Sequence, residues 1–112
     1  MMHELLQRKL TTILVADVAG YSRMVSVDDE RAINTLRQCR TEIDKIIYSL
    51  GGRIFSTGGD SVLAEFPSTV NAVRASASIQ DFLRGFNSDK VEERQFQYRI
   101  GIHVGEVIID GT

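Results

Sequence analysis

The spacing of hydrophobic residues along the chain predicts a strand followed by a long helix. Residues 10–17 (LTTILVAD) are almost continuously apolar and β-branched, a pattern typical of a central strand covered on both faces. Over residues 32–50, apolar side chains recur at the spacing of one helical face. Ser26, with Asp29 three residues later, fits the start of this helix, and the glycine pair 51–52 fits its end.

The rest of the pattern predicts a hairpin, a second helix and a last strand. Two short apolar runs, 53–57 and 61–66, are separated only by Gly-Gly-Asp at 58–60, which is the length of a hairpin turn. Helical spacing returns over 72–86. Strict alternation of apolar and polar residues follows over 96–104, so the last strand should have one apolar face.

The order β-α-β-β-α-β indicates an α+β fold, a ferredoxin-like palm with an antiparallel sheet and helices on one face. Right-handed crossovers place the first strand inside the sheet, antiparallel to the third. The carboxyl end of the first strand, at Asp17, then meets the tip of the hairpin, at Asp60. The topology therefore predicts that two carboxylates far apart in the chain are neighbours at one edge of the sheet.

Composition narrows the classes of function. The chain has 112 residues, of which 43% are hydrophobic, and this fits a single domain. Its net charge of −2, with acids and bases interspersed, gives no basic stripe for nucleic-acid phosphates, so we expect no nucleic-acid partner. We also expect no membrane partner and a cytoplasmic location, because no apolar run is long enough for a membrane span or a signal peptide. The single cysteine, Cys39, is expected in the core.

The two aspartates carry the candidate chemistry. Two carboxylates at one site repel each other, so such pairs either share a proton or hold cations. A turn of small residues over 18–22 follows Asp17, and its backbone N–H groups suit phosphate oxygens. The glycines at 58–59 let a ligand approach Asp60 closely, and carboxylate oxygens suit Mg²⁺ or Mn²⁺. Each aspartate taken singly fits a helix cap or an ordinary turn better, so the hypothesis depends on their convergence.

Three sequence motifs resemble one known family. The segments DVAGYS (17–22), GGRIFSTGGD (51–60) and RIGIHVGEV (99–107) are similar, in order and spacing, to the class III adenylyl/guanylyl cyclase catalytic domain, in particular to its soluble bacterial members. The resemblance implies an N-terminal extension over 1–9 and a cyclase catalytic domain over 10–112 that ends before its C-terminal part.

The resemblance also implies an activity. Family members are phosphorus–oxygen lyases that convert ATP or GTP into a 3′,5′-cyclic nucleotide and pyrophosphate, for cyclic-nucleotide signalling. They use two divalent ions, Mg²⁺ or Mn²⁺, at the interface of a dimer. For this chain the resemblance implies an adenylate cyclase acting on ATP, with GTP as the less favoured substrate, and a homodimer. The family builds each site from two subunits, metal ligands from one and residues of the C-terminal part from the other, so the 112 residues alone are expected to be inactive.

Residue roles follow by position. Asp17 and Asp60 match the catalytic, metal-binding aspartates, and Val18 matches the residue whose backbone carbonyl also reaches a metal ion. Ser56 stands at the base-contact position where adenylyl cyclases usually carry a lysine, and a serine hydroxyl specifies neither purine. The expected phosphate-binding positions are Ala19, Gly20, Tyr21 and Gly59.

Two alternatives remain open at this stage. Diguanylate cyclases also combine an early aspartate with a Gly-Gly-acid hairpin, but their hairpin continues Glu-Phe, whereas residues 61–62 are Ser-Val. A catalytically silent cyclase-like module that dimerises or regulates is favoured by Ser56 and disfavoured by the presence of both aspartates.

Three further polar residues are interpreted as structural. Arg53 and Arg99 lie beside or within predicted strands, where arginine usually covers the surface, so we leave both outside the site. His103 alternates away from the apolar face of its strand, and we expect it to be partly exposed without a catalytic role.

Overall fold

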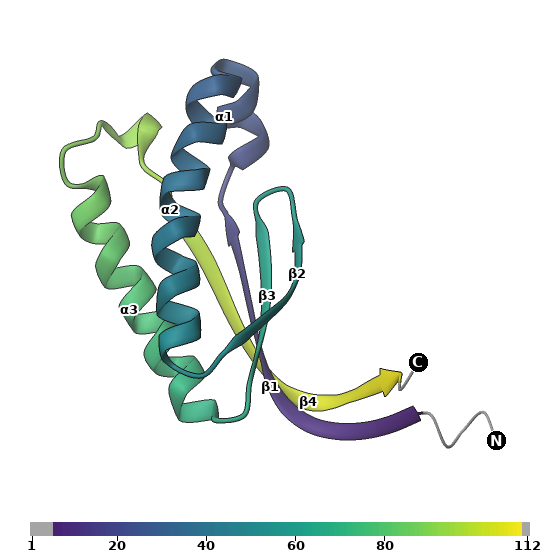
Figure 1. The fold of residues 1–112 in the computed structure, drawn as a ribbon. Coiled ribbons are helices and arrows are strands. Elements are labelled where there is room, and N and C mark those ends of the chain that lie inside the picture. The colour runs from purple at the N-terminus through teal and green to yellow at the C-terminus, as the bar shows by residue number, and fades with distance from the viewer. Residues whose placement is uncertain (1–5, 111–112) are drawn as a thin grey trace.

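The strands of the computed structural model form one antiparallel sheet, and the long helices cover one of its faces (Figure 1). The order across the sheet is β2 (Arg53–Gly58), β3 (Ser61–Phe66), β1 (Leu6–Val18) and β4 (Tyr98–Asp110). The structure describes residues 6–110. The predicted α+β class and βαββαβ order are confirmed, and the first strand lies inside the sheet, antiparallel to the third. The elements are β1 (Leu6–Val18), α1 (Tyr21–Val27), α2 (Asp29–Ser49), β2 (Arg53–Gly58), β3 (Ser61–Phe66), α3 (Thr69–Asn87), a 3₁₀ turn (Glu92–Arg94) and β4 (Tyr98–Asp110).

β1 is longer than the apolar run predicted. It begins at Leu6 rather than at residue 10, because residues 6–9 pair with the far end of β4 although several of them are polar. Ladder hydrogen bonds hold this stretch without an apolar pattern. Residues 6–9, which were predicted as part of an N-terminal extension, are therefore part of a strand. Residues 1–5 of that extension and residues 111–112 of the predicted catalytic domain lie outside the described residues.

Helices cover only one face of β1, so the prediction that both faces are covered is wrong. Leu14, Ala16 and Val18 point under the helices and are at most 2% exposed, whereas Val15 between them is 39% exposed. Alternation places Ile13, Val15 and Asp17 on the side away from the helices. We call this side, with the β4 residues that stand opposite them in the ladder, the open face.

The helix predicted over 32–50 is α2, and a short helix before it, α1, was not predicted. Asp28 has an extended backbone, φ −157°, which separates α1 from α2. The α2 cap is Asp28, whose carboxylate accepts from the Arg31 N–H at 3.1 Å, and not Ser26, whose hydroxyl donates to the Arg23 carbonyl. α1 contains no buried residue, so it leaves no helical spacing of apolar positions in the sequence.

The core fills the space between the sheet and helices α2 and α3. Cys39 belongs to it, as predicted, and burial raises the pKa of its thiol to about 12. Within residues 6–110, none of the helices combines the length and the apolar character that crossing a membrane requires. The largest fully buried side chains are Phe66, Phe96, Leu14, Ile43, Ile47, Ile79, Val62 and Cys39.

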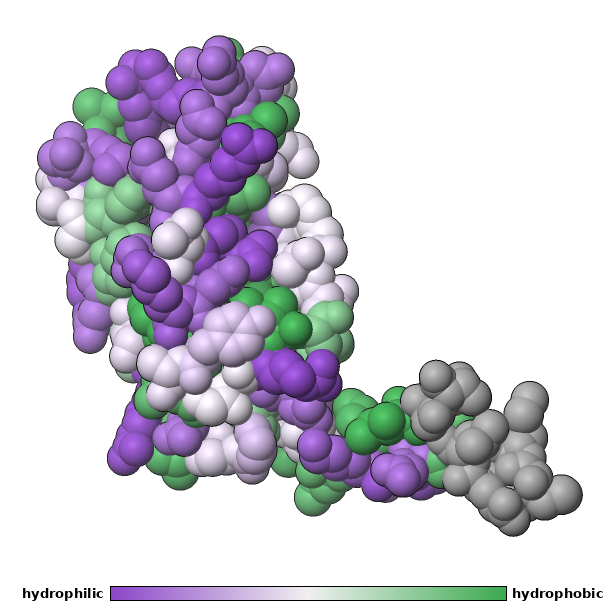
Figure 2. Space-filling view, in the orientation of Figure 1, coloured by the Kyte–Doolittle hydropathy of each residue, from purple (hydrophilic) through white to green (hydrophobic). Residues whose placement is uncertain are grey.

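The last strand has the predicted alternation, but its apolar face becomes more exposed toward the C-terminal end of the strand. Tyr98 is buried and Ile100 half-buried, whereas Ile102 and Val104 are 37% and 51% exposed. β4 is an edge strand, and its second half runs with the first half of β1 as an arm that projects from the body (Figures 1 and 2). Leu10, on this arm, is 74% exposed.

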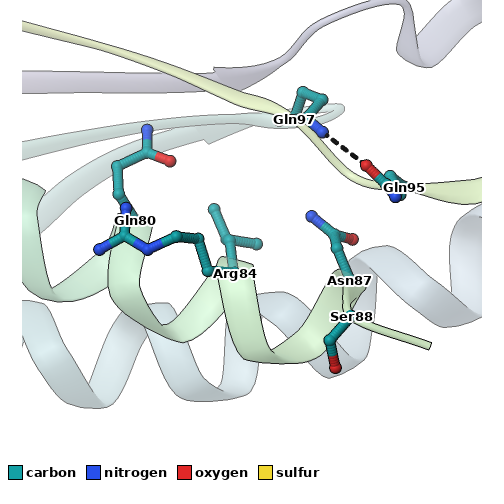
Figure 3. A pocket seen from close by; sticks show the side chains of 7 residues that line it. Gln80, Arg84, Asn87, Ser88, Gln95 and Gln97 are labelled. Atoms are coloured by element: carbon teal, nitrogen blue, oxygen red, sulfur yellow. Dashed lines mark hydrogen bonds between the residues drawn. The ribbon is translucent and has the colours of Figure 1, made fainter. Parts of the chain in front are cut away.

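Side chains from α3 cap the edge of β4 where the strand begins. The Asn87 amide donates to the Phe96 carbonyl and accepts from the Phe96 N–H, both at 2.9 Å, so Phe96 pairs with a side chain and the strand starts at Tyr98. Gln80 donates to the Tyr98 carbonyl at 3.0 Å. A polar cavity of about 230 Å³ lies beside these bonds (Figure 3). The bonds fix the start of β4, one residue before Arg99.

A buried glutamate joins the strands on the open face. Glu65 is only 8% exposed, and its carboxylate lies 3.0 Å from the Arg53 guanidinium and 3.3 Å from the Lys9 ammonium. The hydrogen bond from Arg53, together with Lys9, holds the pKa of Glu65 below its usual range despite its burial.

Glu65→Gln should lower the free energy of unfolding by about 1 kcal/mol at pH 7, because two cations lose their charged partner. The pKa of Glu65 is depressed in the folded state, so its contribution is present above the unfolded pKa of about 4.3 and is lost as the pH falls through the folded value. Urea unfolding at pH 7 and in the acidic range measures both effects.

The control is Glu42→Gln, which removes an exposed ion pair with Lys45 on α2 and should change stability by less than about 0.5 kcal/mol. A Glu65→Gln deficit that is as large in acid as at pH 7 would show that the charge of Glu65 is not its cause.

Candidate active site

The two aspartates meet as the topology predicted. Asp60 lies in the turn between β2 and β3, and one of its carboxylate oxygens, Oδ2, accepts from the Val18 N–H at 2.8 Å. That nitrogen belongs to the peptide that joins Asp17 to Val18, so the Asp60 carboxylate lies against the backbone of Asp17. Figure 1 shows the tip of the β2–β3 hairpin beside the end of β1.

The turn and the strand register together set this position. Gly59 adopts the left-handed conformation, φ 54°, which glycine allows without steric cost and which lets β2 reverse within a short turn. β3 then pairs Val62 with Ala16, and continuing this register places Asp60 level with Val18. The glycine therefore decides where the second carboxylate lies.

Arg99 is a site residue that the sequence pattern did not reveal. It stands directly opposite Asp17 in the β1–β4 ladder, and its Nε donates to Asp17 Oδ1 at 2.8 Å. The hydrogen bond and the charge of Asp17 raise the pKa of Arg99, so the guanidinium remains charged. Only the register between the two strands could have indicated this pair, and spacing within each strand does not give it.

The loop after β1 offers fewer backbone donors than expected. The Ala19 N–H donates to the Gln97 carbonyl at 2.8 Å, so it is already used. Among residues 6–110, no acceptor contacts the N–H groups of Gly20 and Tyr21. The Tyr21 ring packs edge-on against Phe96, and burial together with the charge of Asp60 raises the pKa of its hydroxyl.

Ser56 faces the open side of the sheet because of a bulge. The β2–β3 register shifts between Ile54 and Ser56, and Ser56 pairs with Leu63. Leu63 stands opposite Val15, an open-face residue. Without the bulge Phe55 would occupy this position, so the irregularity gives the exposed Ser56 the same face as Asp17.

The donor set fits a hard divalent cation. Asp17 and Asp60 offer carboxylate oxygens, and Val18, the residue after Asp17, offers a backbone carbonyl. No cluster of three or more histidine, cysteine or acidic side chains with metal-binding geometry occurs among the residues that the structure describes. Magnesium is usually held by one or two carboxylates with substrate phosphates and water supplying the rest, so a third carboxylate is not needed.

Comparison with known proteins decides the family. The model of the adenylate and guanylate cyclase catalytic domain matches residues 6–111. The chain belongs to this family. This cyclase domain is 36% identical, over its whole length, to a Rhizobium meliloti protein named "Putative adenylate cyclase 3". The diguanylate cyclase alternative is thereby set aside.

Solved structures agree with the family. The cyclase domain superposes on an adenylate/guanylate cyclase/hydrolase from Silicibacter pomeroyi with a TM-score of 0.86 and 37% identity, over 96% of this chain and 63% of that one. A bacterial light-regulated adenylyl cyclase, 20% identical, shares the fold with a TM-score of 0.82 over 89% of this chain and 55% of its own. The chain spans 19% of the length of the Rhizobium meliloti protein.

The bond between Val18 and Asp60 predicts different outcomes for two substitutions. Asp60→Ala removes the acceptor and should lower the free energy of unfolding by about 1 kcal/mol. Asp60→Asn keeps a carbonyl oxygen that can accept from the same N–H, so its stability should stay within about 0.5 kcal/mol of the wild type. Thermal or urea unfolding of both variants measures the difference. Equal loss in both would show that the hydrogen bond does not hold the turn.

Proposed function

We propose that this cyclase domain converts ATP, and GTP less readily, into a 3′,5′-cyclic nucleotide and pyrophosphate with two Mg²⁺ or Mn²⁺ ions. The observation that carries the proposal is the position of the Asp60 carboxylate against the Asp17–Val18 peptide in a member of the cyclase family. The 36% identity to a protein named as an adenylate cyclase supports ATP as the first substrate to test.

Asp17, Asp60 and Val18 are the proposed ion ligands. The N–H and C=O of one strand residue point to the same side, so the Val18 carbonyl should face the hairpin, as its N–H does. When bound, two divalent ions would neutralise triphosphate charge and favour loss of the proton from the ribose 3′-hydroxyl. The protein holds the two carboxylates in place for them through the ladder and the Gly59 turn.

The remaining proposed contacts lie around this pair. Gly20 and Tyr21 would donate their backbone N–H groups to phosphate oxygens, and Gly59 would leave room for them because it has no side chain. Ala19 would shape the loop rather than donate, since its N–H is bonded to Gln97. Ser56 would contact the base with a single hydroxyl, which favours neither purine.

In the proposed reaction the ribose 3′-oxygen forms a bond to the α-phosphorus as the bond from that phosphorus to the β-phosphate oxygen breaks. Pyrophosphate leaves with the bonding electron pair, and the 3′-hydroxyl proton passes to solvent. The site contributes mainly positioning and charge neutralisation, which dominate phosphoryl transfer.

A homodimer is the proposed active form, with cyclic-nucleotide signalling in the cytoplasm as its role. The open face supports it, because Val15 and Asp17 lie on a side of the sheet that no helix of the described residues covers. A second copy of the complete gene product, facing this side, would complete the site and exclude water from it.

The test is an assay of the complete gene product that carries this chain, with Mn²⁺ or Mg²⁺ and with ATP or GTP in turn, and with products identified by mass. Cyclic AMP should form faster than cyclic GMP. Asp17→Asn and Asp60→Asn should each lower the rate by at least about 100-fold, because each removes a charged ion ligand.

Glu42→Gln, an exposed change on α2, is the control and should keep full activity. A folded dimer that binds Mn²⁺-nucleotide but yields no cyclic product would contradict the enzymatic proposal and support a silent regulatory module. Product loss in only one of the two aspartate variants would contradict the paired-ligand mechanism.

A further inference from the structure

We propose that Arg99 competes with divalent cations for Asp17: in the unloaded site its guanidinium occupies one oxygen of this carboxylate, and it weakens metal binding until it is displaced. The inference rests on the proposed function, because it takes Asp17 and Asp60 as the ion ligands. It adds a role for a residue of the opposite strand.

The strand register makes the pair unavoidable. Arg99 and Asp17 are Cα partners in the ladder, and both side chains belong to the open face. Residues directly opposite in an antiparallel pair have Cβ atoms about 4.5–5.5 Å apart, so a guanidinium reaches the carboxylate without distorting the backbone. The Nε–Oδ1 distance of 2.8 Å is that of a charge-assisted hydrogen bond.

Each aspartate has one oxygen engaged by the protein, but the two partners differ in charge. Asp60 Oδ2 accepts from the neutral Val18 N–H, whereas Asp17 Oδ1 accepts from a cation. Among residues 6–110, no hydrogen-bond donor reaches the other oxygen of either carboxylate. Because the amide is neutral, it does not oppose the binding of a cation to Asp60. The Arg99 guanidinium opposes a cation at Asp17 in two ways: its positive charge repels the cation, and its hydrogen bond occupies Oδ1.

The contact is suited to competition rather than to support of the metal site. Arg99 uses one hydrogen bond instead of the two-pronged grip that fixes a carboxylate plane, and its side chain is 70% exposed. A single exposed contact orients Asp17 weakly, yet the positive charge repels an incoming cation in every conformer. Because exposed ion pairs are weak, a divalent ion can displace the guanidinium, and free Oδ2 gives it a first point of contact.

The same face contains a matched comparison. Arg53 is 66% exposed and donates to the Glu65 carboxylate at 3.0 Å. Glu65 has Lys9 as a second cation rather than a second carboxylate, so it is no candidate ion ligand. Arg53→Gln therefore removes the same kind of charge from the same face without touching Asp17.

The experiment is a titration of the chain with Mn²⁺ in the absence of nucleotide. Binding is measured by calorimetry and, independently, by the electron paramagnetic resonance signal of free Mn²⁺. Arg99→Gln should bind Mn²⁺ about 3- to 10-fold more tightly than the wild type. Arg99→Lys, which keeps the charge, should stay close to the wild type, and so should Arg53→Gln. The gain in Arg99→Gln should shrink as salt is raised, because salt screens exposed charges.

Unchanged or weaker Mn²⁺ binding in a folded Arg99→Gln variant would overturn the competition. Asp17→Asn separates this failure from failure of the proposed function. If Asp17→Asn loses Mn²⁺ binding while Arg99→Gln matches the wild type, only the role of Arg99 is wrong. If the wild type binds Mn²⁺ no better than Asp17→Asn, the ion site itself is absent. That result would contradict both the competition by Arg99 and the proposed function.

Discussion

The placement of β1 between two antiparallel neighbours decides the rest of the structure. Because each of its residues is paired, the alternation of its side chains is fixed, with Leu14 and Ala16 under the helices and Asp17 on the open face. Burial of the apolar set against α2 and α3 supplies the free energy that keeps this assignment. The position of the site therefore follows from core packing: the alternation that buries Leu14 and Ala16 keeps the Asp17 carboxylate of the same strand on the open face.

The two faces of the sheet are stabilised by different interactions, mainly apolar packing on the helix side and ion pairs on the open face. On the helix side, most buried side chains are apolar, and the buried polar ones, Thr12 and Asn87, are hydrogen-bonded. The buried Tyr98 hydroxyl has no hydrogen-bond partner among residues 6–110. On the open face, acidic side chains lie beside cations, as Glu65 does beside Arg53 and Lys9. Asp60 differs, since its engaged oxygen meets a neutral amide. This contrast leaves the Asp60 carboxylate, at the tip of the hairpin, without a cationic hydrogen-bond partner among residues 6–110.

Much of the fold could be predicted from the sequence, because an element with one buried side has apolar residues at a regular spacing. α3 and β3 have one buried side and were predicted within a few residues, and the meeting of Asp17 with Asp60 followed from the order of elements and right-handed crossovers. Elements without burial were missed: α1 has no buried residue, and residues 6–9 of β1 are held by ladder hydrogen bonds.

The candidate site was only partly predictable, for a related reason. Its loops and aspartates are contiguous motifs, which a sequence displays directly. The Asp17–Arg99 pair and the bulge that turns Ser56 to the open face are properties of register, which depends on how two distant strands align. The use of the Ala19 N–H by Gln97 likewise depends on a contact between segments that are remote in the chain.

The long β1–β4 ladder also limits how the chain can change in length during evolution. One residue inserted or deleted within 10–16 would turn every later side chain of β1 to the opposite face. Asp17 would then point into the core, and an apolar residue would take its place outside. The segment from Ser88 to Gln95 is not in the ladder, so homologous chains should gather their insertions there.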